Sequence, residues 1–235
     1  MDFLLVIKRC YWAVWRERWR LSPSRHYEHF METRFDHKFG LDTVARVPLS
    51  ALRIDSGNRA FGRVYAGSPI AQVRRGLRQL DVRSEEFTFI DLGSGKGRVL
   101  LLASELGFRR IVGVEFAPEL HAIAQRNIGR YPPCAGRDVR SLCVDAGNFP
   151  IPAESCVVYL YRPFGLPVVE LVARNIAAAV AAGAARIVVV YLWPIERQPF
   201  DRDPRFRLRQ SGPTLAVYDA LEADFCTDDR ARHQS

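Results

Sequence analysis

One stretch of the sequence limits the possible folds more than any other, because an apolar run leads through an acid into three alternating glycines. Residues 87–102 read FTFIDLGSGKGRVLLL, which predicts a buried strand, a turn and the start of a helix. Glycines let a ligand lie against backbone N–H groups at a helix N-terminus, so this order predicts a nucleotide-shaped site at the carboxyl end of a parallel strand. Asp91 puts a negative charge beside the turn, which suits a cationic or polyhydroxylated ligand better than a pyrophosphate.

The rest of the chain repeats the order of strand and helix and predicts an α/β fold. Apolar runs predict five strands, and alternating residues around Ser211-Gly212-Pro213 predict a closing hairpin: 87–92, 110–115, 139–144, 156–161, 186–192, 206–209 and 214–221. Helical patterns lie between them at 97–106, 118–128 and 164–182. We therefore expect a doubly wound, mostly parallel seven-stranded sheet with a C-terminal antiparallel hairpin and a helical N-terminal arm.

The first 60 residues differ in texture from the rest, since they are aromatic, basic and broken by proline and glycine. We divide the chain into an arm and cap (1–60), a core (61–225) and a polar tail (226–235). The arm is expected to be helical to about Arg34, with an irregular polar stretch over 35–43. Residues 63–69 predict a turn, and Ser68 is expected to cap a helix whose apolar face contains Ile70, Val73, Leu77 and Leu80.

Charge and cysteine content bear on partners and compartment. The net charge of +8 would suit nucleic acid, but only three of the 34 basic residues are lysines, and arginine this dominant indicates genomic base composition. Nucleic acid is therefore left open and not favoured. Five scattered cysteines form no C-x-x-C pair, which argues against a metal site and for the cytoplasm. Trp12, Trp15 and Trp19 would share one helix face, which either packs on the protein or makes a peripheral membrane or partner contact through residues 3–20.

Three acids follow successive strands, where a doubly wound sheet holds its ligand. Glu115 can accept both hydroxyls of a ribose, and Asp145 with Ala146 can meet an adenine edge. Asp91 can hold the ammonium of an amino-acid group, directly or through water. We assign these residues, with the turn and the neighbour of Glu115, to cofactor binding: Asp91, Gly93, Ser94, Gly95, Gly97, Glu115, Phe116, Asp145 and Ala146.

The DLGSGKG sequence at 91–97 together with Glu115 resembles motif I and the following acid of class I S-adenosylmethionine-dependent methyltransferases. The likeness extends over roughly 61–221 and is greatest to small bacterial members of unassigned substrate; a weaker likeness is to non-SET protein-lysine methyltransferases. The resemblance implies S-adenosylmethionine as cofactor, no metal, and methyl transfer to an N or O nucleophile. It leaves the acceptor open between a protein side chain or small molecule, which we favour, and RNA.

The segment after the fourth strand departs from the family pattern. Related proteins often have Asn before Pro-Phe, whereas this chain reads Tyr161-Arg162-Pro163-Phe164. Arg162 is a fixed cation that cannot accept a bond from an amine, so it either pairs with a substrate carboxylate or phosphate or faces solvent. We assign these four residues and Tyr65 as the catalytic residues, on the acceptor side of the pocket.

Two other functions are compatible with parts of the sequence. A nicotinamide-dependent oxidoreductase needs G-x-G-x-x-G, and Arg98 stands where its third glycine belongs. The other rival is a catalytically inactive methyltransferase-like module that binds a partner through its Trp/Arg arm. The intact glycine turn and the three acids argue against that module.

Overall fold

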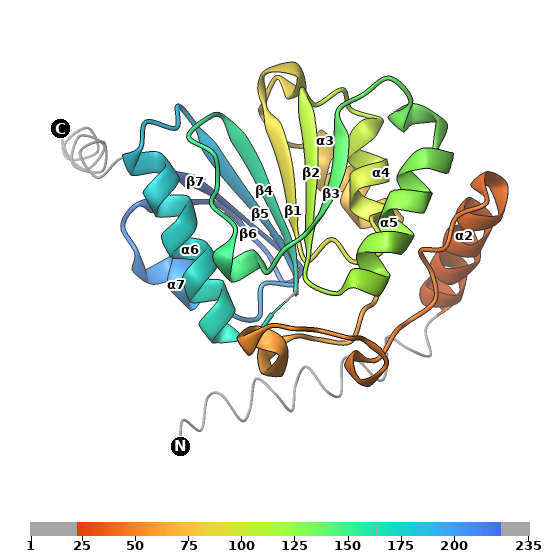
Figure 1. Ribbon diagram of the computed structural model, residues 1–235. Coiled ribbons are helices and arrows are strands. Elements are labelled where there is room, and N and C mark those ends of the chain that lie inside the picture. Colours follow the sequence, from red (N-terminus) through yellow and green to blue (C-terminus); the bar gives the residue numbers. More distant parts are fainter. Residues whose placement is uncertain (1–22, 163, 222–235) are drawn as a thin grey trace.

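The computed structural model describes residues 23–162 and 164–221, whose seven strands form one sheet (Figure 1). The strand order is β3-β2-β1-β4-β5-β7-β6, with a parallel part and an antiparallel hairpin, so the predicted fold is confirmed. The parallel strands are β1 (Thr88–Leu92), β2 (Arg110–Glu115), β3 (Val139–Cys143), β4 (Cys156–Tyr161) and β5 (Ile187–Leu192), and the hairpin consists of β6 (Phe206–Ser211) and β7 (Leu215–Ala220).

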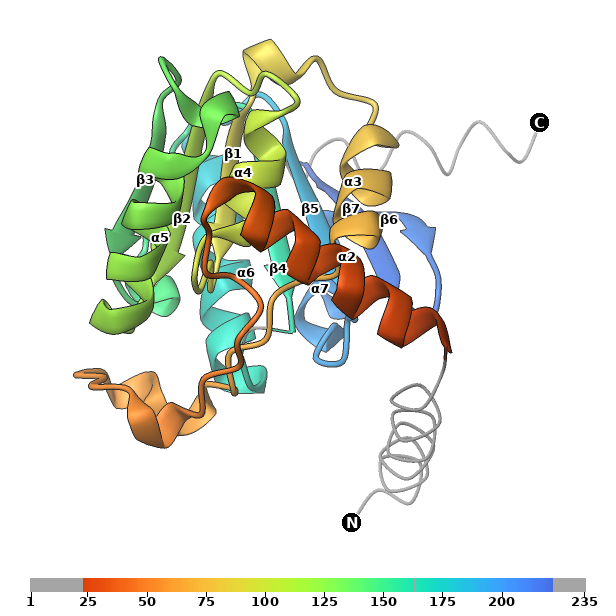
Figure 2. The ribbon, with the colours of Figure 1, turned by 90° about the vertical axis from the view of Figure 1, so that its right-hand side faces the viewer.

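Helices cover both faces of the sheet, which explains why its central strands are continuous apolar runs (Figures 1 and 2). One face carries α6 (Leu166–Ala181) and α7 (Gln198–Arg202); the other carries α3 (Ile70–Arg78), α4 (Arg98–Ser104) and α5 (Pro118–Arg130), with α2 (Pro23–Phe39) outside them. Successive strand residues serve opposite cores: Ile90 packs with Val169 of α6, and Phe89 packs with Leu101 of α4.

Helix α2 is longer than the sequence indicated, so the irregular stretch predicted over 35–43 is wrong for its first five residues. Phe35 is buried, and its ring lies 5.4 Å from those of both Phe39 and Tyr131. This aromatic packing stabilises the last helical turn, because tertiary burial outweighs the weak local pattern. Gly40, with a φ of 64°, ends the helix.

Residues 42–68, which we call the strap, cross the carboxyl ends of the strands (Figure 1). The strap contains the short 3₁₀ turns η1 (Leu49–Ala51) and η2 (Gly57–Phe61). The turn predicted at 63–69 is instead extended, because Tyr65 makes an antiparallel bridge to Val47 and Gly62 makes one to Phe164. Ser68 is not a helix cap: α3 is capped by Pro69 without a side-chain bond.

Some predictions fall outside the described residues. These are the tryptophan face at 12–19, the polar tail at 226–235 and Pro163. Within the described ranges, no helix is both long and apolar enough to cross a membrane.

Candidate donor and acceptor pocket

The glycine turn joins β1 to α4 and is tied to the end of β2. Gly93, Gly95 and Gly97 have φ values of 82°, 54° and 83°, a region that only glycine enters freely. The backbone N–H groups of Gly93 and Ser94 donate to the Val114 carbonyl at 2.8 and 3.0 Å. The turn therefore folds back over β2, where its backbone N–H groups meet the acid that ends that strand.

Asp91 stands one residue before the end of β1, buried in the centre of the sheet. It lies in register with Gly113 of β2 and Tyr159 of β4 and is 2% exposed. Burial raises the pKa of Asp91 well above its ordinary value, and the nearby charge of Glu115 raises it further. A cationic ligand group beside Asp91 would relieve both effects.

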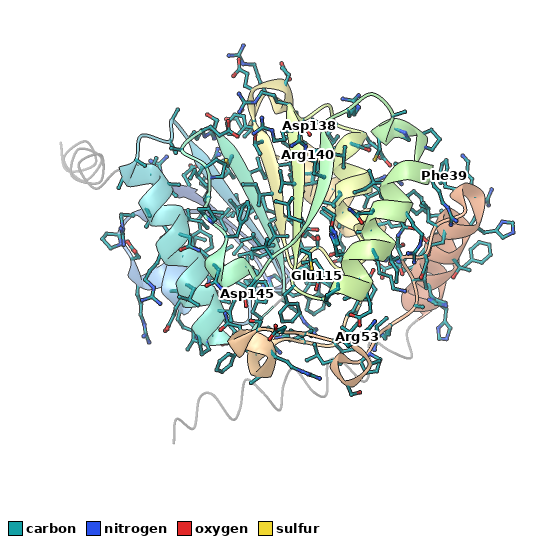
Figure 3. The ribbon with its side chains drawn as sticks, in the orientation of Figure 1. Phe39, Arg53, Glu115, Asp138, Arg140 and Asp145 are labelled. Carbon is teal, nitrogen blue, oxygen red and sulfur yellow. The ribbon has the colours of Figure 1, made fainter. Side chains whose placement is uncertain are left out.

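Glu115 ends β2 and has one backbone donor on each carboxylate oxygen. The Gly95 N–H donates to Oε2 at 2.8 Å and the Ala117 N–H donates to Oε1 at 2.9 Å. Burial raises its pKa to about 7, although N–H groups of Ala117, Gly95 and Phe116 favour the charged form. Figure 3 shows Glu115 and Asp145 toward the same end of the sheet, opposite Asp138 and Arg140.

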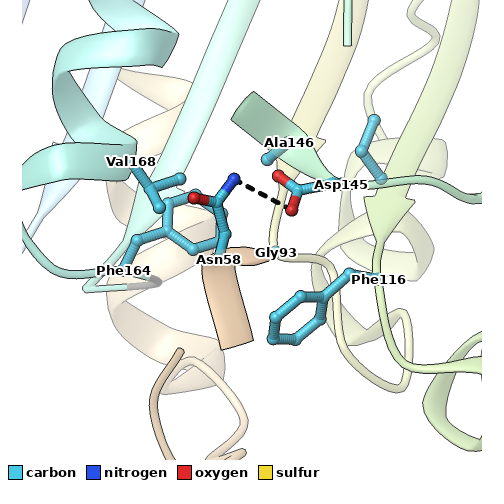
Figure 4. A pocket seen from close by; sticks show the side chains of 8 residues that line it. Asn58, Gly93, Phe116, Asp145, Ala146, Phe164 and Val168 are labelled. Atoms are coloured by element: carbon cyan, nitrogen blue, oxygen red, sulfur yellow. Dashed lines mark hydrogen bonds between the residues drawn. The ribbon is translucent and has the colours of Figure 1, made fainter. Parts of the chain in front are cut away.

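Asp145 follows β3 and fastens the strap to the sheet (Figure 4). Its carboxylate accepts from the Gly147 N–H at 2.7 Å, from Asn58 Nδ2 at 3.0 Å and from the Ser56 hydroxyl. Beside it lies a small, mostly apolar pocket of about 260 Å³ including its open mouth. The pocket is lined by Asn58, Gly93, Val114, Phe116, Asp145, Ala146, Phe164 and Val168. Asn58 and Asp145 are the polar side chains of this lining.

A second pocket, of about 650 Å³ including its open mouth, adjoins the first. It brings together most of the residues assigned from sequence to the donor and acceptor sides, namely Tyr65, Asp91, Gly93, Ser94, Glu115, Phe116, Tyr161, Arg162 and Phe164. Gly93, Phe116 and Phe164 line both pockets. Gly95 and Gly97 line neither, since Gly95 lies under the Tyr65 ring and Gly97 packs against Ala124 of α5.

The two tyrosines of this pocket stay neutral. Tyr65 donates its hydroxyl proton to the Thr43 carbonyl at 2.9 Å, and burial raises its pKa far above the usual range. Burial also raises the pKa of Tyr161, although the charge of Arg162 opposes the shift. A neutral phenol can orient a nucleophile by hydrogen bonding, but it cannot act as a base near pH 7.

Arg162 occupies a strained backbone position at the mouth of the pocket. Its φ is 43°, and Trp193 at the end of β5 has a φ of 54°. Arg162 directly follows Tyr161 of β4, and Trp193 directly follows Leu192 of β5. Because Tyr161 and Leu192 are paired in register, the two neighbouring strands end side by side, each followed by a residue with left-handed backbone. Such conformations in residues other than glycine cluster at functional sites.

Sequence reasoning missed several residues around these pockets. Arg98 served only as evidence against a dinucleotide site, yet it is buried and lines the larger pocket. Thr43, Ser56 and Asn58 belong to the irregular strap, whose sequence carries no periodic signal of their contacts. Among the described residues, no group of three or more His, Cys, Asp or Glu side chains could hold a metal ion.

Comparisons with known proteins agree with this arrangement. Residues 90–183, from β1 to the end of α6, match the family model described as a methyltransferase domain. A predicted N6-adenine-specific DNA methylase from Listeria monocytogenes has a similar fold, with a TM-score of 0.50, 11% identity, and coverage of 66% of this chain and 51% of that one. An RNA methyltransferase from Salinibacter ruber, solved with S-adenosyl-L-homocysteine, has a TM-score of 0.49, 26% identity, and coverage of 67% and 95%. A search of the curated proteins finds no match.

Proposed function

Since this chain is a class I, Rossmann-like S-adenosylmethionine-dependent methyltransferase, we propose that it methylates an N or O nucleophile of a protein side chain or a small molecule. One observation carries the proposal: Asp91, Glu115 and the start of the glycine turn share one pocket with Tyr161, Arg162 and Phe164. A nucleophile held by the second group would therefore stand next to a donor held by the first. We place the reaction in the cytoplasm, which the cysteine pattern favours.

We assign the donor to the residues whose remaining bonding capacity fits it. An ionised carboxylate offers about four lone-pair positions. Glu115 accepts from the Gly95 and Ala117 N–H groups on different oxygens, so its carboxylate can still accept from ribose hydroxyls. Asp145 accepts two hydrogen bonds on Oδ2 and one on Oδ1. Its Oδ1 can therefore still accept a hydrogen bond from the adenine amine. Asp91, which has no neutralising charged partner within residues 23–162 and 164–221, would take the ammonium.

The chain's own part in the reaction is to position and desolvate. The cofactor supplies a methyl group activated by a positive sulfur, which a nucleophile displaces in line. Phe164 is buried at the junction of the two pockets and excludes water there, and the neutral hydroxyl of Tyr161 can orient the nucleophile. Arg162 would hold a carboxylate or phosphate of the acceptor.

The acceptor can be identified directly. The purified protein is incubated with cell extract and S-adenosylmethionine carrying a deuterated methyl group, and mass spectrometry follows the label in separated protein, small-molecule and RNA fractions. We expect the label in protein or small molecules. We also expect Asp91→Ala to lose at least about tenfold in donor affinity and transfer, because a charged hydrogen bond is removed. The matched control is Glu170→Ala, which changes an exposed acid on α6.

Each other result contradicts a defined part of the proposal. Label found only in RNA would overturn the acceptor class. Donor binding without label in any fraction would favour an inactive binding module. Equal donor binding by wild type and Asp91→Ala would overturn the role given to Asp91.

A further inference from the structure

The larger pocket contains a buried guanidinium whose hydrogen bonding is incomplete. Arg98, the first residue of α4, is 2% exposed. Its Nε donates to Thr43 Oγ1 at 2.8 Å, and its Nη1 donates to the Ser68 carbonyl at 3.1 Å and pairs with Glu32 at 3.0 Å. Its Nη2 is buried and has no hydrogen-bond partner within the described part of the chain.

The orientation of this guanidinium is fixed from several sides. Thr43 is itself held by Asp36, to which its hydroxyl donates at 2.6 Å. Gly67 lies flat against the group, since a Cβ built there would stand 2.6 Å from Arg98 Cζ and 2.7 Å from Nη1. Helix α2, the strap and α4 together therefore hold Nη2 in one place.

A buried N–H donor without an acceptor costs free energy, so its retention beside a pocket indicates a ligand that accepts from it. Glu32 already balances the charge of Arg98, so Nη2 is left as a hydrogen-bond donor whose direction is fixed. Ser94 lines the same pocket, and its buried hydroxyl also has no hydrogen-bond partner among the described residues. Two unsatisfied donors and the acid Asp91 in one pocket match the carboxylate and ammonium of a free amino-acid group.

We propose that Arg98 Nη2 binds the carboxylate of the donor's amino-acid group, with the Ser94 hydroxyl as a second donor and Asp91 on the ammonium. The inference rests on the donor site proposed above. It makes Arg98 a binding residue for the cofactor and explains why the strap is fastened to α4 through Thr43 and Ser68.

A comparison of two ligands tests the assignment without relying on activity. Calorimetry measures the Kd of S-adenosylhomocysteine and of its decarboxylated analogue, which keeps the ammonium, for the full-length protein. We expect wild type to prefer the carboxylated ligand by at least about tenfold, because one charge-assisted hydrogen bond is lost without it. In Arg98→Lys, which keeps the charge beside Glu32 but lacks Nη2, the preference should fall to about twofold or less.

Two further variants decide the result if Arg98→Lys does not fold. Gly67→Ala keeps Arg98 but displaces its guanidinium, so it should lower the same preference. Arg78→Lys, an exposed change on α3, should leave the preference at its wild-type value. A wild-type protein that binds both ligands equally, or folded Arg98→Lys and Gly67→Ala variants that keep the full preference, would overturn the assignment. Failure of wild type to bind either ligand would instead refute the donor site itself.

Discussion

At the scale of single residues, Glu115 gives the protein a stability that depends on pH. Burial raises its pKa in the folded state to about 7, from an ordinary value of 4.5. Between these values the folded state holds a proton that the unfolded state has released, so stability falls as the pH rises through this window.

We expect the cofactor-free wild type to lose about 2 kcal/mol more stability between pH 5 and pH 8 than Glu115→Gln, which cannot ionise. Urea unfolding at several pH values measures the difference. Asp91 is present in both proteins, so the part of its raised pKa that comes from burial cancels in the comparison. Parallel pH profiles for the two proteins would contradict the raised pKa. Glu115→Gln should also bind the donor more weakly at every pH, because its amide offers only one acceptor atom.

At the scale of elements, the fold was predictable where each element carries its own signal. The apolar runs of β1, β2, β4 and β5 located the sheet, and Asp91 and Glu115 fall at its carboxyl edge because parallel strands end together. The strap was not predictable, because the side-chain contacts that place it on the sheet join residues far apart in the sequence. Asn58 reaches Asp145, 87 positions away, and no local pattern reports such a contact.

Asn127 shows how one side chain joins three elements. From α5 it accepts from the Asp42 N–H at 3.0 Å and donates to the carbonyls of Asp42 and Lys96 at 3.0 and 2.9 Å. The start of the strap and the glycine turn are thus bound to the same buried amide.

We expect Asn127→Ala to lower the free energy of unfolding by about 2–3 kcal/mol, because buried backbone groups lose their partners. It should also weaken donor binding, since the glycine turn and the strap both lose an anchor. Gln125→Ala, an exposed change on the same helix, should stay within about 0.5 kcal/mol of wild type. Chemical denaturation and calorimetry measure both quantities. An Asn127→Ala protein as stable as the Gln125→Ala control would show that the strap is held by other contacts.

At the scale of the whole molecule, the pockets lie where the strand order reverses. The chain goes from β1 outward to β3, then returns past β1 to β4 and β5, which opens a crevice at the carboxyl ends of the strands. The strap crosses this crevice from outside. Helix α2 holds the strap through Asp36, which accepts from the Thr43 N–H, and holds Arg98 of α4 through Glu32. The residues that we assign to the donor therefore depend on packing contacts that begin at α2.

Because α2 contacts the strap and α4, deleting residues 2–20 and deleting residues 2–39 should affect donor binding differently. S-Adenosylhomocysteine at 100 times its Kd should add about 2.7 kcal/mol of stability, or roughly 5–10 °C in Tm for a chain of this size. We expect a variant lacking residues 2–20 to keep that shift while losing acceptor methylation or association with anionic vesicles. A variant lacking residues 2–39 also loses Glu32, Phe35 and Asp36, so its Tm and its shift should both be smaller. Differential scanning fluorimetry compares the three proteins. If the variant lacking residues 2–20 loses the ligand-induced rise in Tm, part of the donor site lies within the first 20 residues. If its acceptor methylation and vesicle binding are unchanged, these residues have no part in recognising the acceptor or a membrane.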